Sequence, residues 1–184
     1  RPHWARRRNC CPSFCPCPCR INMNGNRLPN GLRFWNPSTI ISTWFGSGLL
    51  PWAPGTWGSL ATLPFAWVVS FHWGVPGMII ATFALFLIGI WSTKKYLRFS
   101  SEPDPQTIVI DEVVGQFISL IFLPTEIFWF LAAFILFRIA DITKPWPASW
   151  ADRSLKGALG IMADDIFAGV YVLGFLSIIY ATIG

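Results

Sequence analysis

No Asp, Glu, Lys or Arg occurs between Phe34 and Thr93. Soluble domains contain roughly 25% charged residues, which cover their water-facing surfaces. A segment of this length without any charge cannot form such a surface, and the whole chain agrees, with 53% hydrophobic and only 12% charged residues. Its 11 Trp residues also suit a protein that meets two water–lipid interfaces. The uncharged segment therefore predicts insertion into a membrane.

The positive charge of the chain is concentrated at its N-terminal end. Residues 1–33 contain seven Arg and no acid, whereas the rest of the chain has seven basic and nine acidic residues. All five Cys lie in a Pro-rich run from Cys10 to Cys19, which is typical of a disordered leader, with zinc binding as the alternative. We expect a leader at residues 1–35 and one membrane domain at residues 36–184. Because this domain is not basic, no nucleic-acid partner is expected.

Long apolar runs alternate with short polar or Pro- and Gly-containing segments along the domain. This pattern predicts an all-α, multi-pass membrane protein with short helical hairpins, because most runs fall below the roughly 20 residues of a full span. The last run, from Ile166 to Gly184, is the best single spanning segment. The expected helices cover residues 39–45, 60–71, 78–91, 107–123, 127–139 and 166–184.

The hairpins predict a domain with two different ends. Folding them back places the tips at residues 72–77 and 124–126 at one end, and every Lys and Arg of the domain at the other. The positive-inside rule assigns the Lys- and Arg-bearing end to the cytoplasm. Most acidic residues of the domain fall at this same end, so we expect a polar active site that faces the cytoplasm.

Polar residues concentrate at 137–169, between long apolar runs. Charge beside such a background is costly unless it is solvated, paired or holding a cation. Arg138 and Asp141 stand three apart and share one face of a helix. Asp164 and Asp165 are expected to open the last helix, where carboxylates suit the positive end of the helix dipole. We interpret this stretch as the core of the active site.

Five carboxylates are the candidate catalytic residues, because the hairpins bring them to one face. There are more carboxylates here than the nearby cationic side chains can neutralise. Such an excess indicates a bound hard cation, and oxygen ligands suit Mg²⁺. The candidate catalytic residues are Asp111, Glu112, Asp141, Asp164 and Asp165, and the candidate metal ligands among them are Asp111, Asp141, Asp164 and Asp165.

Two kinds of group are candidates for phosphate binding. The cationic side chains of Arg138 and Lys144 can hold a phosphate against the metal. The Gly- and Pro-rich residues 46–60 are expected to form a structured loop, whose last part can offer backbone N–H groups to phosphate oxygens. In that loop the candidates are Gly55, Thr56, Gly58 and Ser59, with Ser59 also expected to cap the next helix.

Each of these features also has a purely structural explanation. The two adjacent Asp residues can be explained as a helix cap alone, and the Arg–Asp spacing as an ordinary ion pair. The glycine-rich segment can be explained as a turn that binds no ligand. The functional interpretation depends on their convergence on one predicted face. It indicates phosphoryl chemistry at a membrane surface.

Several phosphatase mechanisms are excluded by residue content. No Cys follows Cys19, so a thiolate nucleophile is absent from the domain. His3 and His72 are the only histidines, which excludes a histidine-nucleophile lipid phosphatase, and no DxDx[TV] motif offers an aspartyl-phosphate route. Hydrolysis by a metal-activated water remains.

Four motifs resemble, in order and spacing, those of the bacterial phosphatidylglycerophosphatase A family: GSGLLPWAPGTWGSL at 46–60, IDEVVGQ at 110–116, FRIADITKPWP at 137–147 and GIMADDIFAG at 160–169. The resemblance implies an all-helical, multi-pass enzyme of the bacterial inner membrane. It implies Mg²⁺-dependent removal of the terminal phosphate of phosphatidylglycerophosphate, which gives phosphatidylglycerol. The oligomeric state is left open. Two alternatives also remain, namely a non-enzymatic cation carrier and a phosphatase for a different lipid phosphate.

Overall fold

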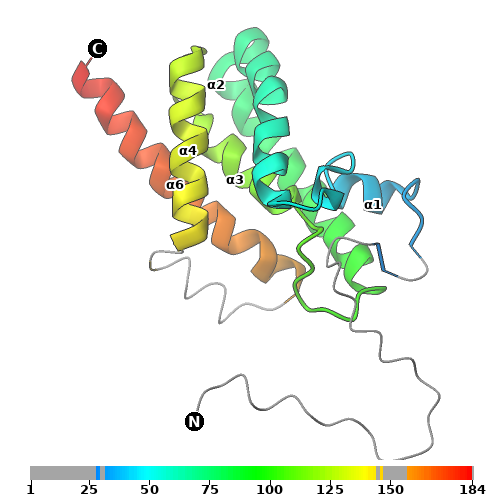
Figure 1. Ribbon diagram of the computed structural model, residues 1–184. Helices are drawn as coiled ribbons and strands as arrows, with labels where there is room; N and C mark the ends of the chain where they lie inside the picture. The colour runs from blue at the N-terminus through cyan, green and yellow to red at the C-terminus, as the bar shows by residue number, and fades with distance from the viewer. Residues whose placement is uncertain (1–27, 30–31, 144–145, 147–156, 184) are drawn as a thin grey trace, which may run out of the picture.

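The structure is a computed structural model that describes residues 28–29, 32–143, 146 and 157–183 (Figure 1). Its described residues form helices and no strand, which confirms the all-α class. Most of the expected leader and the candidate Lys144 lie outside the described residues. The elements are α1 (Pro37–Ser42), the short 3₁₀ helix η2 (Ser47–Leu49), α2 (Pro54–Leu97), α3 (Ile110–Leu120), α4 (Ile127–Thr143) and α6 (Ala158–Ile183).

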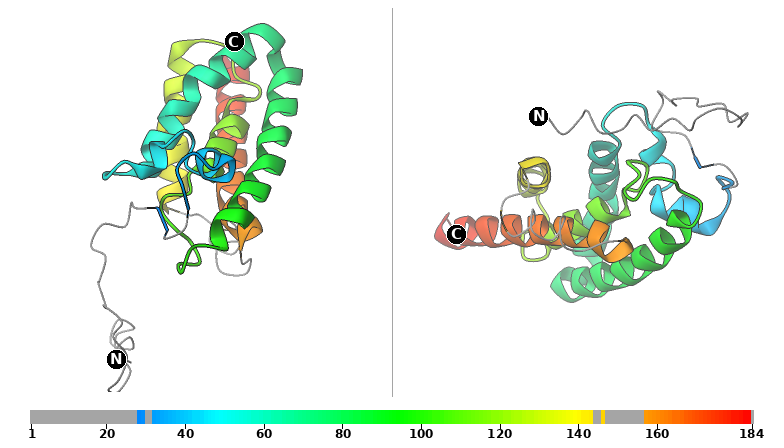
Figure 2. Two further views of the ribbon diagram at one scale, coloured as in Figure 1. Left: turned by 90° about the vertical axis from the view of Figure 1, so that its right-hand side faces the viewer. Right: turned by 90° about the horizontal axis from the view of Figure 1, so that it is seen from below.

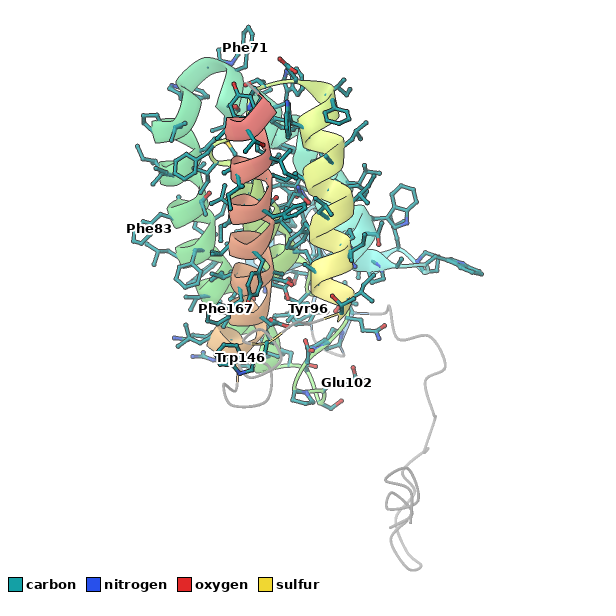
Figure 3. The ribbon with its side chains drawn as sticks, turned by 90° about the vertical axis from the view of Figure 1, so that its left-hand side faces the viewer. Phe71, Phe83, Tyr96, Glu102, Trp146 and Phe167 are labelled. Atoms are coloured by element: carbon teal, nitrogen blue, oxygen red, sulfur yellow. The ribbon has the colours of Figure 1, made fainter. Side chains whose placement is uncertain are left out.

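The long helix α2 is a helical hairpin. Its path breaks at Gly74, where φ is 57° and ψ is −150°, a conformation that glycine adopts far more readily than other residues. Figure 3 shows Phe71 near this bend and Tyr96 at the opposite end of the molecule. The predicted hairpin is confirmed, but both arms extend further than expected, and the predicted tip at 72–77 narrows to a bend.

The packing of α2 is inverted relative to a soluble protein. Its buried residues are mostly small or hydroxyl-bearing, whereas large apolar side chains such as Ile80 and Phe83 are 70% and 62% exposed. Small residues let membrane helices approach closely, and apolar side chains face the lipid. By length and composition, α2 and α6 can each cross a membrane. The buried residues are Gly55, Gly58, Ser59, Thr62, Ala66, Met78, Gly89, Ser92, Thr93 and Tyr96.

Helix α3 lies at the centre of the molecule, packed against α2, α4 and α6 (Figure 2). All of its residues except Glu112 are buried. Its 11 residues give a length of roughly 16 Å, which is too short to cross a bilayer. It crosses α6 closely, because a Cβ added to Gly115 would lie 2.7 Å from the backbone oxygen of Asp165. The crossing therefore has no room for a side chain at this position.

The molecule has the two different ends that the hairpins predict. At one end, the Ser70 and Thr125 hydroxyl oxygens lie 2.8 Å apart, so the predicted tip at 124–126 contacts α2 just before its bend. At the other end, Lys94 and Lys95 are exposed beside Tyr96. Exposed apolar side chains continue to this second end, where Ile142 is 72% exposed.

Several helix boundaries differ from the expected ones. Helix α1 begins at Pro37, because Asn36 caps it by accepting a hydrogen bond from the Ser38 backbone N–H, and it ends at Ser42. Helix α6 begins at Ala158, so Asp164 and Asp165 lie inside it. The expectation that these two residues open the helix is wrong. The preceding residues include Ala, Leu and Met, which favour helix, and they extend it past the apolar run.

Candidate active site

A pocket of about 380 Å³ lies where α3, α4 and α6 meet the start of α2. All five candidate carboxylates line it, together with Arg138, so these side chains lie around one pocket, as their placement by the hairpins predicts. Figure 3 shows this end of the molecule around Tyr96, Glu102 and Trp146. The remaining walls, which sequence reasoning did not identify, are Pro51, Ala53 and Pro54 before and at the start of α2, and Asp104, Pro105, Gln106 and Ile108 between α2 and α3.

Three carboxylates form a compact cluster on the pocket wall. Asp111, Glu112 and Asp165 each offer an oxygen within 4.8 Å of the other two. Asp165 is only 3% exposed. One oxygen each of Asp111 and Glu112 is buried without a hydrogen-bond partner among the described residues. Buried oxygens of this kind need a cation or a proton, and an all-oxygen set fits a hard divalent cation. The cluster is a candidate metal site.

The pKa values of two cluster members also indicate that the cluster favours a bound positive charge. Burial raises the pKa of Asp111 well above its usual value, and the adjacent Glu112 charge raises it further. Burial, followed by the charge of Asp165, raises the pKa of Glu112 to about 8. In the absence of a cation, the Glu112 carboxyl group would hold its proton at neutral pH. A cation in the cluster would relieve the repulsion and favour the ionised forms.

Arg138 lies next to the cluster and is anchored by a partner on its own helix. Its Nη1 atom lies 2.7 Å from Asp141 Oδ2 and 3.8 Å from Glu112 Oε1. The ion pair that was the structural alternative for residues 138 and 141 is therefore formed. The Nε atom of Arg138 is buried and has no hydrogen-bond partner among the described residues. An anion such as phosphate would satisfy this donor.

The first turn of α2 closes another side of the pocket. A Cβ added to Gly55 would lie 2.0 Å from Glu112 Oε1, so this backbone touches the acidic cluster directly. The prediction of a loop at 54–59 is wrong, because α2 begins at Pro54, a position where proline favours a helix start. Ser59 does not cap α2, since its hydroxyl donates inside the helix to the Gly55 carbonyl oxygen. Thr56, Gly58 and Ser59 are not among the pocket-lining residues.

The structure groups the acids differently from the expected ligand set. Sequence reasoning selected Asp111, Asp141, Asp164 and Asp165 as ligands and gave Glu112 only a catalytic role. Here Glu112 joins Asp111 and Asp165 in the cluster, while Asp141 pairs with Arg138. Adjacent residues of a helix point about 100° apart, and of the adjacent Asp164 and Asp165 only Asp165 belongs to the cluster. Asp111 and Glu112 are adjacent too, yet both belong to it.

Comparisons with known proteins decide the family. A model of the phosphatidylglycerophosphatase A family matches residues 40–180. The chain belongs to this family. The matched range contains every residue that lines the pocket. The resemblance recognised in the motifs is therefore confirmed.

Named relatives of the phosphatidylglycerophosphatase A family cover most of the chain. It is 40% identical over 147 residues to phosphatidylglycerophosphatase A of Escherichia coli, a match that covers 79% of this chain and 84% of the relative. The corresponding protein of Haemophilus influenzae is 41% identical over 152 residues, covering 82% and 93%. A Bacteroides thetaiotaomicron protein, provisionally named phosphatidylinositol-3-phosphatase, is 37% identical over 157 residues, covering 79% and 94%. No solved structure matches the chain.

Proposed function

We propose that this pocket is the active centre of a membrane phosphatidylglycerophosphatase, which cleaves phosphatidylglycerophosphate to phosphatidylglycerol and phosphate. Membership of the family supports the activity and the phospholipid substrate. One observation carries the assignment to this pocket, namely the meeting of three clustered carboxylates, two of them buried, with an arginine at one end of a helical membrane domain. Such a site combines a place for a cation with a place for a phosphate.

The cluster residues Asp111, Glu112 and Asp165 are proposed to hold Mg²⁺, because hard oxygen ligands suit this ion. Bound there, the ion would supply Lewis-acid activation of the attacking water. Arg138 contacts the phosphate oxygens, and Asp141 fixes the orientation of its guanidinium group.

Two further groups complete the proposed site. Asp164, which lines the same wall, is the proposed proton acceptor for the attacking water. The first turn of α2, at Gly55, presents the positive end of a helix dipole to the negatively charged phosphate. Lys144 is proposed as a second phosphate contact, although it lies outside the described residues.

Phosphate release by the purified protein tests this function. We expect release from phosphatidylglycerophosphate in the presence of Mg²⁺, loss of release after chelation, and recovery when Mg²⁺ is added back. Phosphatidylglycerol, which lacks the terminal phosphate monoester, is the control and should yield no phosphate. Undiminished release after exhaustive chelation would show that no metal is needed.

The same proposal includes a multi-pass arrangement in a bacterial inner membrane, with the pocket facing the cytoplasm. The two arms of α2 and the helix α6 have the length and composition of spans. The exposed Lys94, Lys95 and Arg98 lie at the pocket end, and such residues favour the cytoplasmic side.

Cysteine labelling tests this orientation. In a variant without the native cysteines, which lie between Cys10 and Cys19, Thr143→Cys and His72→Cys introduce single exposed thiols at the two ends. We expect an impermeant maleimide to label His72→Cys in spheroplasts and Thr143→Cys only after the membrane is opened. The reverse pattern would invert the topology, and labelling of both positions in sealed spheroplasts would contradict a spanning hairpin.

A further inference from the structure

The rim of the pocket carries a glutamine that the proposed chemistry does not use. The segment between α2 and α3 contributes Asp104, Pro105, Gln106 and Ile108 to the wall. Gln106 is exposed, whereas its neighbours Pro105 and Thr107 are buried. A polar side chain thus stands at the mouth of the pocket on a backbone that is fixed on both sides.

Hydrogen bonds hold this backbone in place. The Ile108 N–H donates to the Pro105 carbonyl oxygen at 3.0 Å, which closes a turn around Gln106. The Thr107 hydroxyl lies 2.7 Å from the hydroxyl of buried Tyr96 on α2. Immediately after the turn, the Val109 N–H donates to the Ser42 carbonyl oxygen at 2.9 Å. The position of Gln106 is therefore set by α1 and α2 before any substrate binds, and such preorganisation lowers the entropy cost of a contact.

The chemistry of the substrate matches this arrangement. With its terminal phosphate beside Arg138 and the acidic cluster, the lipid must continue outward past the rim. The next part of its head group is a three-carbon glycerol unit with one free hydroxyl, followed by a phosphodiester. A hydroxyl both donates and accepts hydrogen bonds, and an amide side chain offers both functions. The other polar rim residue, Asp104, carries a carboxylate, which only accepts when ionised.

We propose that Gln106 is a specificity-determining residue that binds the head-group hydroxyl of the lipid substrate. This inference rests on the proposed function, because it places the terminal phosphate at the acidic cluster. Gln106 then recognises the part of the head group that the chemistry leaves unchanged. Two relatives carry names with different head groups, phosphatidylglycerophosphate and, provisionally, phosphatidylinositol 3-phosphate, so a contact to this part of the lipid is one that can distinguish substrates.

A substrate comparison tests the contact. Phosphatidylglycerophosphate is compared with an analogue that has propane-1,3-diol in place of glycerol, which lacks only this hydroxyl. We expect wild-type kcat/KM to be about five- to tenfold higher for the natural lipid, as one hydrogen bond allows. Gln106→Ala should remove this preference by lowering kcat/KM for the natural lipid alone. Glu102→Ala, an exposed change in the same segment away from the pocket wall, is the matched control and should keep the preference.

The outcomes separate this inference from the proposed function. An equal loss of kcat/KM on both lipids in Gln106→Ala would show a structural role for Gln106 and overturn the inference. An unchanged preference of this variant for the natural lipid would overturn it as well. Wild-type protein that cleaves neither lipid would refute the proposed function itself, and the inference with it. Wild-type protein that cleaves both lipids equally would leave the proposed function standing and overturn only the role of Gln106.

Discussion

Asp165→Asn is expected to lower kcat for phosphate release by about 10²- to 10⁴-fold, the usual cost of removing a catalytic group. Asparagine keeps the shape of the side chain but removes a negative charge from a cluster whose ligand atoms lie within 4.8 Å of one another. Cation affinity should fall with it, so part of the activity should return at high Mg²⁺ concentration. Measurement of kcat across a Mg²⁺ titration checks both effects.

The stability of this variant should move in the opposite direction from its activity. Without metal, three clustered carboxyl groups either repel each other or take up protons, and replacing one by a neutral amide removes that cost. We therefore expect the melting temperature of the metal-free variant to equal or exceed that of the wild type. Glu126→Gln, at the opposite end of the molecule, is the matched carboxylate control and should leave activity and Mg²⁺ dependence unchanged. Activity of Asp165→Asn within a few-fold of wild type at every Mg²⁺ concentration would refute the metal site.

Gly115→Ala is expected to damage both the fold and the activity. The added Cβ would lie 2.5 Å from the Phe137 ring and 2.7 Å from the Asp165 backbone oxygen. A ring can turn, but a backbone atom moves only if α6 moves, and overpacking of this kind costs about 1–3 kcal/mol. For a protein of this size we expect the melting temperature to fall by roughly 2–12 °C. Activity should fall at least about tenfold as well, because the displaced backbone carries Asp165 and small misplacements of catalytic groups are costly.

The matched control for this change lies on α6 itself. A Cβ added to Gly174 meets nothing within 4 Å, so Gly174→Ala changes the same residue type without a clash. Alanine favours a helix more than glycine does, and this variant should be as stable as the wild type or slightly more so. Thermal unfolding in detergent and phosphate release compare the two variants. Equal behaviour would show that the crossing of α3 and α6 is not tightly packed.

The helical class, the hairpin and its two ends could be predicted from the sequence because they depend on the length of apolar runs and on the distribution of charge. The hydroxyl pair of Ser70 and Thr125 lies at the end where both tips were predicted. The pairing of Arg138 with Asp141 was also predictable, since it is set within one helix. These features arise from local spacing or from the contrast between lipid and water.

The features that could not be predicted arise where a helix continues through polar residues. Apolar runs mark only the lipid-facing part of a helix, so the first turns of α6, which carry Asp164 and Asp165 toward the pocket, read as a loop. The first turn of α2 was missed for the same reason, since Gly55 and Ser59 are buried against protein rather than lipid. The role of Glu112 depends on how closely α6 crosses α3. Such a distance between helices has no signature in residue spacing.

The apolar surface that reaches the pocket end has a kinetic consequence. Ile142 is 72% exposed beside Asp141, and Trp57 is 47% exposed close to Gly55, so acyl chains can stay in lipid while the head group enters the pocket. With the proposed function, the substrate would then never pass through water and would meet the protein by lateral diffusion. Its effective concentration is then its mole fraction among the lipids of the membrane. Adding inert lipid would lower this mole fraction even when the amount of substrate per unit volume is unchanged.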